Sequence, residues 1–399
     1  MTDVAEAEAL ILGRMPSLPD AQRPLSETGG GVLREDIVAE RDQPPFDRVT
    51  MDGIAIRYAD WAQGLRRYRV AGIQAAGAPA LGIHVSGRCV EIMTGAVLPD
   101  GADTVIPVER LTREREDAVI ESSTRVSHGQ FIHPRGSDRA AGTRLLASGC
   151  TIGPAEMAVL ASAGRPRIRV TEPPRVAVIS TGDELVDVGE PIEPYQIRSS
   201  NDRAIEASLV RHCQARVIRV SLRDDPATIL EAIAELHAAC DTLILSGGVS
   251  MGQYDFVPQV LARLGVELVF HRIEQRPGRP MWFGISEASK PVFALPGNPV
   301  STLVCLTRYV LPALRQAMGL APAPVETARL SAAVQFSADL AYFLPVVLSC
   351  DESGVTWAAP RPTNTSGDFV SLAGTDGFVQ LPREQAAFDR GTTARVFRW

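Results

Sequence analysis

The chain has 399 residues, of which 45% are hydrophobic and 22% charged, a composition typical of a folded globular protein and not of a disordered tail. The formal net charge of −7 leaves no basic surplus for binding nucleic acid or an anionic membrane. No apolar run approaches the roughly 18–20 residues of a membrane span, and the acidic N-terminus lacks the basic start of a signal peptide. We therefore expect a cytoplasmic protein that binds neither nucleic acid nor membrane.

Cysteine and lysine usage both bear on how a site should be interpreted. The six cysteines are scattered, none in the C-x-x-C spacing of a redox or zinc site, and we expect buried thiols in a reducing cytosol. Of the 40 basic residues 39 are arginine, and Lys290 is the single lysine. So lopsided a ratio indicates a coding bias, and an arginine in a site here is not a choice over lysine.

Glycine and proline clusters divide the chain into regions. Residues 1–44 open with a helical pattern from Val4 to Ile11. Residues 45–135 contain short alternating segments with turns, which predict a small β-rich unit. Residues 136–171 contain a helix expected to start near Pro154 and to end at Gly164.

Residues 172–320 alternate between short apolar strands and helices, which predicts a doubly wound α/β domain. The near-continuous apolar strands favour a parallel sheet covered on both faces. Residues 321–399 return to strand alternation and predict a β-barrel or sandwich. The expected strands and helices of the α/β domain are 175–180, 201–212, 215–220, 226–239, 241–245, 256–264, 266–270, 291–295 and 300–318.

Three strands of this domain end in loops rich in glycine or proline, at 180–185, 245–255 and 295–301. Ligands of open α/β sheets bind outside the carboxyl ends of the strands. Glycines let backbone N–H groups approach an anion, and a helix start adds positive dipole. Pro299 falls just inside the last helix, where proline is favoured. Each loop alone could be a simple turn, whereas all three together predict a binding site.

Acidic residues accompany these loops, namely Asp183, Glu184, Asp255 and the pair Asp224–Asp225. Carboxylates beside anion-binding glycines suggest Mg²⁺, which uses one or two carboxylates plus phosphate oxygens. Asp225 also has a simpler interpretation, because acids are favoured at the start of the helix that begins at residue 226.

Three arginines, Arg272, Arg276 and Arg279, lie between the second and third loops, the last two around a Pro-Gly turn. They can converge on an oxyanion, although a solvated basic turn is the alternative. The six histidines form no metal-binding or catalytic pattern. The sequence also lacks a G-x-S-x-G elbow, a P-loop and a G-x-G-x-x-G fingerprint, so hydrolase, kinase and dehydrogenase functions have no support.

The motifs together resemble the molybdopterin molybdenumtransferase family, which includes the E domain of gephyrin. The resemblance covers nearly the whole chain in the family's order. The motifs that carry it are PPFD at 44–47 with MDG at 51–53, MTGA at 93–96, STGDEL at 180–185, SGGVSMG at 246–252 and LPGNPVS at 295–301.

The resemblance implies the last step of molybdenum cofactor synthesis. Adenylylated molybdopterin and molybdate bind, Mg²⁺ assists release of AMP, and the dithiolene receives molybdenum. It implies four domains, namely 1–44 with 136–171, an inserted β-rich 45–135, an α/β 172–320 and a β-barrel 321–399. It further implies a homodimer whose active site lies between the third domain of one subunit and the second domain of its partner. Molybdopterin adenylyltransferase and molybdoenzyme acceptors are further implied partners.

Site residues are carried over position by position. The resemblance implies catalytic roles for Asp52, Thr94, Glu184, Asp224 and Asp255, with Glu184 and Asp255 also as metal ligands. Arg272 and Arg276 fall where the family usually has lysine, and Arg is a planar fork rather than a point charge. The expected substrate-binding residues are Ser180, Gly182, Asn201, Ser246, Gly247, Gly248, Ser250, Arg272, Arg276, Arg279, Pro296, Gly297, Asn298, Pro299 and Ser301.

Three positions depart from the family pattern, with Ser137 and Ser199 where acids are common and Ile54 where tyrosine is usual. A diverged non-catalytic or scaffold paralogue that binds a molybdopterin nucleotide is therefore the alternative function. For the enzyme, molybdate is expected against Arg276, Arg279 and Ser301, because a dianion needs donors without nearby carboxylates and this loop corner is basic or neutral. The free N–H groups of the helix start there are expected to contribute.

Overall fold

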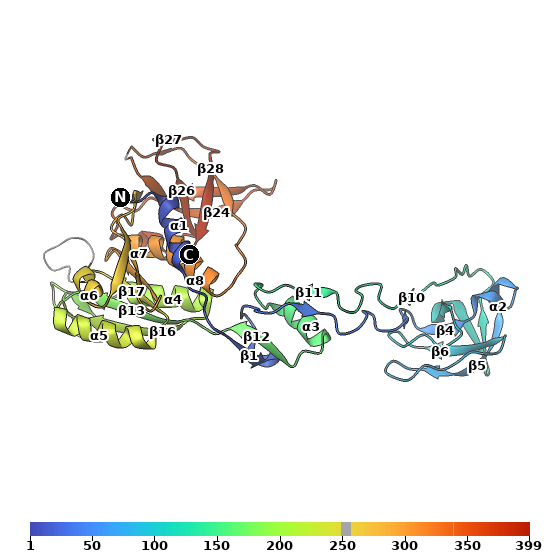
Figure 1. The fold of residues 1–399 in the computed structure, drawn as a ribbon. Coiled ribbons are helices and arrows are strands. Elements are labelled where there is room, and N and C mark those ends of the chain that lie inside the picture. The colour runs from blue at the N-terminus through green and yellow to red at the C-terminus, as the bar shows by residue number, and fades with distance from the viewer. Residues whose placement is uncertain (249–256, 338) are drawn as a thin grey trace. The chain divides into compact units, whose positions relative to one another are not determined.

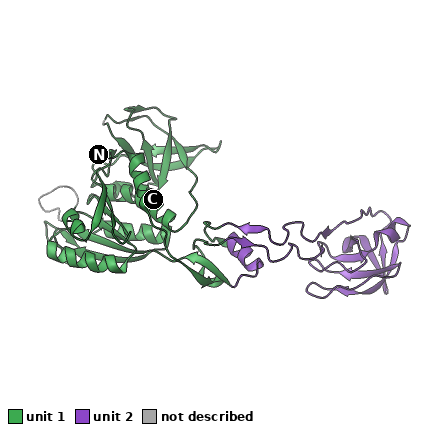
Figure 2. Ribbon diagram, in the orientation of Figure 1, with its two compact units in different colours: residues 1–35, 148–154, 167–399 green, residues 36–147, 155–166 purple. Residues whose placement is uncertain are grey.

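The structure is a computed structural model that describes residues 1–248, 257–337 and 339–399. The chain divides into two compact units, residues 1–35, 148–154 and 167–399 in the first and residues 36–147 and 155–166 in the second (Figure 2). The expected four-domain division remains a prediction.

A six-stranded mixed sheet forms the centre of the first unit, in the order β16-β13-β17-β21-β20-β18. The first four strands are parallel, as the apolar strand pattern predicted, whereas β20 is antiparallel to both β21 and β18. The sheet is thus not parallel throughout, because β18 and β20 are joined by a short turning segment and not by a crossover helix. The strands are β13 (Arg175–Thr181), β16 (Arg216–Leu222), β17 (Thr242–Ser246), β18 (Val266–His271), β20 (Trp282–Ser286) and β21 (Pro291–Leu295).

Helices cover both faces of this sheet, which confirms the doubly wound α/β class (Figure 1). Alternate residues of β13 separate onto two cores, with Val176 and Val178 in one and Ala177 and Ile179 in the other. The first core also takes side chains from α1, α4, α7 and α8, and the second from α5 and α6. The helices are α1 (Val4–Arg14), α4 (Asn201–Cys213), α5 (Pro226–Ala239), α6 (Val257–Arg263), α7 (Pro299–Cys305) and α8 (Leu311–Ala317).

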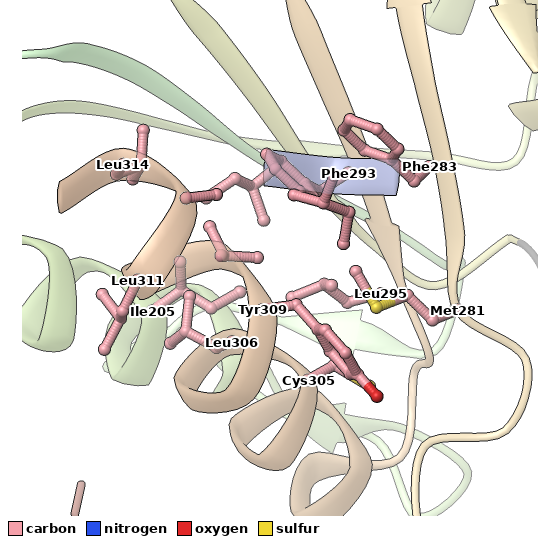
Figure 3. Packing of buried hydrophobic residues seen from close by; sticks show 14 of the residues in the cluster. Ile205, Met281, Phe283, Phe293, Leu295, Cys305, Leu306, Tyr309, Leu311 and Leu314 are labelled. Carbon is pink, nitrogen blue, oxygen red and sulfur yellow. The ribbon is translucent and has the colours of Figure 1, made fainter. Parts of the chain in front are cut away.

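The long helix expected at 300–318 is interrupted by a π-helical segment, η3 (Leu306–Val310), between α7 and α8. Pro312 lies in the first turn of α8. It has no N–H to donate, and its ring would clash with the carbonyl of a regular α-helical turn before it, so a local change in winding is favoured there. Figure 3 shows Cys305, Leu306, Tyr309 and Leu314 from these segments packed toward the sheet.

The C-terminal region forms a closed five-stranded barrel, because β24 pairs with both β25 and β26 while β22 and β28 complete the ring. A short strand of the α/β region, β19 (Gln275–Arg276), adds to the barrel beside β24. The expectation of a β-barrel is thus confirmed. The barrel strands are β22 (Thr327–Leu330), β24 (Ala341–Cys350), β25 (Thr356–Pro360), β26 (Gly377–Leu381) and β28 (Thr393–Arg398).

Shorter elements complete the first unit. They are β1 (Asp20–Pro24) paired with β12 (Arg167–Thr171), β14 (Leu185–Val186) paired with β15 (Ile197–Arg198), β23 (Val334–Gln335) paired with β27 (Ala387–Phe388), and the 3-10 turns η1 (Leu25–Glu27) and η4 (Phe369–Leu372).

The second unit contains a six-stranded sheet in the order β7-β4-β6-β5-β9-β8. Four of its strands match the β-rich pattern of the sequence, and the charged hairpin β8–β9 does not show in that pattern. The sheet elements are β4 (Gly53–Ile56), β5 (Arg67–Gln74), β6 (Arg88–Ile92), β7 (Thr104–Pro107), β8 (Leu111–Glu114) and β9 (Asp117–Ile120), with α2 (Tyr58–Ala62) and η2 (Val108–Arg110). The remaining elements are β2 (Ile37–Val38), β3 (Arg48–Val49), β10 (Ile132–His133), β11 (Arg144–Leu146) and α3 (Pro154–Ser162).

Four of the six cysteines are buried, as expected, whereas Cys150 is half-buried and Cys350 is exposed. Burial raises the pKa of the thiols of Cys89 and Cys213 to about 12, so both stay protonated at neutral pH. Within the described residues, no helix has the length and apolarity needed to cross a membrane.

Candidate functional site

The three loops predicted from the sequence lie at one edge of the sheet. They follow β13, β17 and β21, which are adjacent and parallel, so their carboxyl ends meet. Asn201, the first residue of α4, joins the second loop to the third. Its Nδ2 donates to Ser246 Oγ at 2.9 Å and to Gly297 O at 2.8 Å. The structure therefore brings Asn201, Ser246 and Gly297 together, and the described parts of the three loops lie at one edge of the sheet.

Two glycines of the second loop are required by their surroundings. Gly247 has φ +99°, and a Cβ there would lie 2.8 Å from Thr181 O. Gly248 has φ +68°, and its Cβ would lie 2.7 Å from Val257 Cγ2. Any side chain would strain the backbone and collide, so the close approach of this loop to β13 depends on glycine.

The end of β13 carries two buried hydroxyls. Ser180 and Thr181 are 2% and 5% exposed, and their hydroxyl oxygens have no hydrogen-bond partner within the part of the chain that the structure describes. Buried hydroxyls normally have partners, and Thr181 Oγ1 lies beside the second loop, 3.1 Å from where a Cβ of Gly248 would be. Two residues predicted for the same loops, Ser250 and Asp255, lie outside the described residues.

Carboxylates gather at the ends of β13 and β16. Asp183 Oδ1 accepts a hydrogen bond from the Asp224 backbone N–H at 3.4 Å. The Glu184 carboxylate folds over Gly182, where an added Cβ would lie 2.5 Å from Oε2. Asp225 instead caps α5 by accepting from the Thr228 N–H at 2.8 Å, which confirms the simpler interpretation of that residue.

The donor chemistry of this acidic edge fits a hard cation. Asp183 and Glu184 are exposed, and both offer oxygen donors of the kind that Mg²⁺ prefers. Across the described ranges, no three His, Cys, Asp or Glu side chains form a group that could hold a metal by themselves. Magnesium is usually bound by one or two carboxylates together with water and substrate phosphate oxygens, which is compatible with these acids.

The arginine turn lies beside the barrel. Gln275 and Arg276 pair with Ala341 and Tyr342 of β24, which attaches the turn to the barrel sheet. Arg276 and Arg279 are exposed, and the Arg276 guanidinium lies 6.0 Å from the Phe336 ring centroid. The first arginine, Arg272, has φ +76°.

A cavity of about 330 Å³ opens between this turn, the third loop and the barrel. Among the residues that the structure describes, its walls contain two guanidinium groups, several hydroxyls and two side-chain amides, and no aspartate or glutamate. The predicted site residues that line it are Arg276, Arg279, Pro296, Asn298 and Ser301. Arg272 is not among its lining residues. The remaining polar lining residues are Gln275, Tyr342, Thr363, Thr365 and Ser366.

The third loop is fastened to the barrel by two hydrogen bonds. Asn298 Nδ2 donates to Ser366 Oγ at 2.7 Å, and the Val300 N–H donates to Ser366 O at 3.0 Å. Pro299 is the first residue of α7, as predicted. The Val300 N–H is thus not among the free N–H groups that the helix start was expected to offer, because it donates to the barrel.

The barrel hydroxyls and Gln275 were missed by the sequence reasoning. Thr363, Thr365 and Ser366 belong to a polar loop after β25, which resembled an ordinary turn of a structural barrel. Gln275 is a neutral residue next to Arg276, and nothing in the sequence marks it as a site residue. The hydroxyl-rich run at 363–366 was the one available signal.

In the second unit, the two predicted residues Asp52 and Thr94 are in contact. The Thr94 N–H donates to Asp52 Oδ1 at 2.6 Å, and this hydrogen bond lowers the pKa of Asp52. Both side chains are exposed, so the carboxylate is ionised and accessible at neutral pH.

A larger cavity of about 650 Å³ lies elsewhere in the first unit, lined mainly by apolar residues of α1, α8, β28 and the segment 320–326. None of the predicted site residues lines it. Beside it, Arg308 is 2% exposed and donates from Nη2 to Glu8 Oε2 at 2.7 Å. Burial alone would raise the pKa of Glu8, but the hydrogen bond and charge of Arg308 lower it overall.

Comparison with known proteins agrees with this geometry. Residues 2–164 match the MoeA N-terminal region (domain I and II), residues 177–316 a probable molybdopterin binding domain, and residues 327–399 the MoeA C-terminal region (domain IV). A Synechocystis protein named molybdopterin molybdenumtransferase is 38% identical, with 100% of each chain covered. A Staphylococcus aureus protein of the same name is 31% identical, over 98% of this chain and 94% of its own.

A solved structure titled molybdopterin biosynthesis moea protein from Pyrococcus horikosii superimposes with a TM-score of 0.85 at 31% identity, covering 100% of this chain and 99% of its own. Full-length likeness in sequence and in fold, with the predicted loops gathered at one sheet edge, leads to one assignment. This chain belongs to the molybdopterin molybdenumtransferase family, whose members are transferases of molybdenum cofactor biosynthesis.

Proposed function

We propose that the protein transfers molybdenum from molybdate to an adenylylated molybdopterin, with magnesium-dependent release of AMP. Family membership supports the general reaction, because relatives spanning the whole chain bear the name molybdopterin molybdenumtransferase. The observation that carries the substrate assignment is the carboxylate-free cavity with Arg276, Arg279 and Ser301 in its walls.

Molybdate fits the cavity by charge and by donor type. A tetrahedral dianion is held by cations and neutral hydrogen-bond donors, and a nearby carboxylate would repel it. Arg276 and Arg279 supply the positive charge, and Ser301 with the barrel hydroxyls supplies neutral donors. The planar fork of arginine can donate two parallel N–H groups to one oxyanion, whereas lysine acts as a point charge.

The nucleotide is proposed to lie along the neighbouring loop edge. Pro296 and Asn298 line the cavity and flank Gly297, whose carbonyl accepts a hydrogen bond from Asn201. The third loop therefore contributes both to the cavity and to the loop edge of the sheet. Gly247 and Gly248 let backbone approach phosphate groups closely. The Ser180 hydroxyl, which has no partner among the described residues, would donate to the same ligand.

Magnesium would be held by Glu184 and Asp255, with Asp183 and Asp224 nearby, and by phosphate oxygens of the nucleotide. When bound, it would offset negative charge on the phosphoanhydride. The chain's own acids orient this end of the substrate, while the arginines hold the oxyanion at the other. An Asp255→Asn variant is expected to impair the magnesium-dependent release of AMP, and an unchanged magnesium dependence would assign the metal to Glu184 or Asp183.

We further propose a cytoplasmic homodimer in which Asp52 and Thr94 complete the site of the partner subunit. Molybdopterin adenylyltransferase would supply the nucleotide, and molybdoenzymes would accept the finished cofactor. These partners follow from the chemistry of the substrate and product.

The test is AMP release from adenylylated molybdopterin, measured with and without molybdate and Mg²⁺. Release that requires both ions supports the transferase. Nucleotide binding without release would instead indicate the diverged, non-catalytic alternative, to which Ser137 and Ser199 point.

A further inference from the structure

A buried glutamine lies directly beneath the arginine turn. Gln275 is fully buried, although its neighbour Arg276 is exposed. Its Nε2 donates to Pro277 O at 3.0 Å and to Cys305 Sγ at 3.6 Å, and its Oε1 accepts from the Tyr309 hydroxyl. A buried amide is costly unless its groups are bonded, and here both ends of the amide have partners.

The turn rests on this glutamine and on Cys305. The Cys305 thiol donates to Gly278 O at 3.5 Å. A Cβ at Gly278 would lie 2.6 Å from both Cys305 Sγ and Gln275 Nε2, so the backbone of the turn contacts these side chains directly. Burial keeps the Cys305 thiol protonated, because it raises the pKa of that group well above its usual value.

These hydrogen bonds fix the direction of two backbone carbonyl groups of the turn. Pro277 O and Gly278 O are both bonded to buried donors, although both residues line the cavity. A carbonyl oxygen turned toward the cavity would place partial negative charge against an oxyanion. The buried donors hold these oxygens in the core, and the turn presents Arg276 and Arg279 to the cavity instead.

Two partners together fix which way the amide of Gln275 faces: Pro277 O can only accept and so requires Nε2, and the Tyr309 hydroxyl donates to Oε1. Burial raises the pKa of the Tyr309 hydroxyl, which therefore stays neutral and donates to Oε1. If the amide were reversed, Oε1 would face Pro277 O, and two acceptors would repel. Figure 3 shows Tyr309 and Cys305 side by side between the helix and the sheet.

We propose that Gln275, oriented by Pro277 O and Tyr309, is a positioning residue for oxyanion binding. It fixes the turn so that the cavity presents cations and not carbonyl oxygens to the substrate. This inference rests on the proposed function, because it takes molybdate as the occupant of the cavity.

The test is a Gln275→Met/Tyr309→Phe double variant, which replaces both polar partners by apolar groups of similar shape. Because Pro277 O loses its buried donor, the urea midpoint is expected to fall, and molybdate binding is therefore measured on protein shown to be folded. Half-saturating molybdate is expected to rise by about tenfold, while binding of adenylylated molybdopterin stays the same. The matched control is Gln316→Met, which removes a glutamine-to-carbonyl bond on α8, outside this cavity.

Two further measurements keep the outcomes separate. Tyr309→Phe alone removes one hydroxyl and should raise half-saturating molybdate by a smaller factor, so it serves if the double variant does not fold. Calorimetric titration with molybdate alone tests the cavity: no binding, or binding unaffected by Arg276→Ala, defeats the proposed function. If Arg276→Ala weakens molybdate binding but the folded Gln275 and Tyr309 variants bind molybdate as the original protein does, only the positioning role is overturned.

Discussion

Replacing Arg276 with alanine should weaken molybdate binding far more than nucleotide binding. Among the described residues that line the cavity, Arg276 and Arg279 are the two cations and none is a carboxylate, so Arg279 alone would compensate for the loss of Arg276. A charge-assisted hydrogen bond contributes about 1.5–3 kcal/mol, and about 1.4 kcal/mol is a factor of ten in affinity. The concentration of molybdate needed for half-saturation should therefore rise roughly tenfold or more.

The assay is a molybdate titration of AMP release at saturating adenylylated molybdopterin. Arg276→Lys keeps a point charge and should recover part of the affinity, because lysine lacks the planar fork. Arg329→Ala removes an exposed arginine of the same barrel that does not line the cavity, and it should change nothing. Unchanged half-saturation in Arg276→Ala, with the loss appearing in nucleotide binding, would refute the placement of the oxyanion.

Three other predictions address the shared site and the stability of the first unit. Mixing Asp52→Asn subunits with Glu184→Gln subunits should restore part of the activity, since the proposed site takes one residue from each subunit; inactivity of the mixed dimers would contradict a shared site. Glu8→Gln should lower the free energy of unfolding by about 3–5 kcal/mol, because it leaves the charge of the buried Arg308 unpaired. Because folding lowers the pKa of Glu8, its carboxylate stabilises the folded state at pH values above the ordinary pKa of 4.5. This stabilisation is lost as the pH falls through the folded-state pKa, so the urea midpoints of the original protein and of Glu8→Gln should converge in acid. Lys290→Met should cost about 1 kcal/mol in urea unfolding, because Lys290 Nζ donates to two carbonyl oxygens at the end of α5, whereas Lys290→Arg should retain most of that stability.

Local pattern was sufficient where local physics decides structure. The helix predicted at 226–239 has those bounds in α5, because a proline and a capping aspartate begin it. The apolar runs of the parallel strands could also be predicted from the sequence, because a strand that is covered on both faces has no polar side. The three loops were identified for the same reason, because strand ends followed by glycine or proline mark the ligand edge of an α/β sheet.

Contacts between distant segments escaped the same reasoning. The strand β20 and the attachment of β19 to the barrel depend on which strands become neighbours, and no local pattern encodes that choice. The π-helical segment within the last helix likewise departs from a pattern that reads as one continuous helix.

The sequence by itself determined the fold class, the family resemblance and most of the residues of the loop edge, because these depend on motifs short enough to be read along the chain. The tertiary structure alone decided that the barrel hydroxyls join Arg276 in one cavity and that Gln275 and Tyr309 meet beneath it. Gln275 and Tyr309 are 34 residues apart, and Ser366 is 68 residues from Asn298. Pairings at such separations arise from how the sheet, helix and barrel pack, and no single segment contains the information that specifies them.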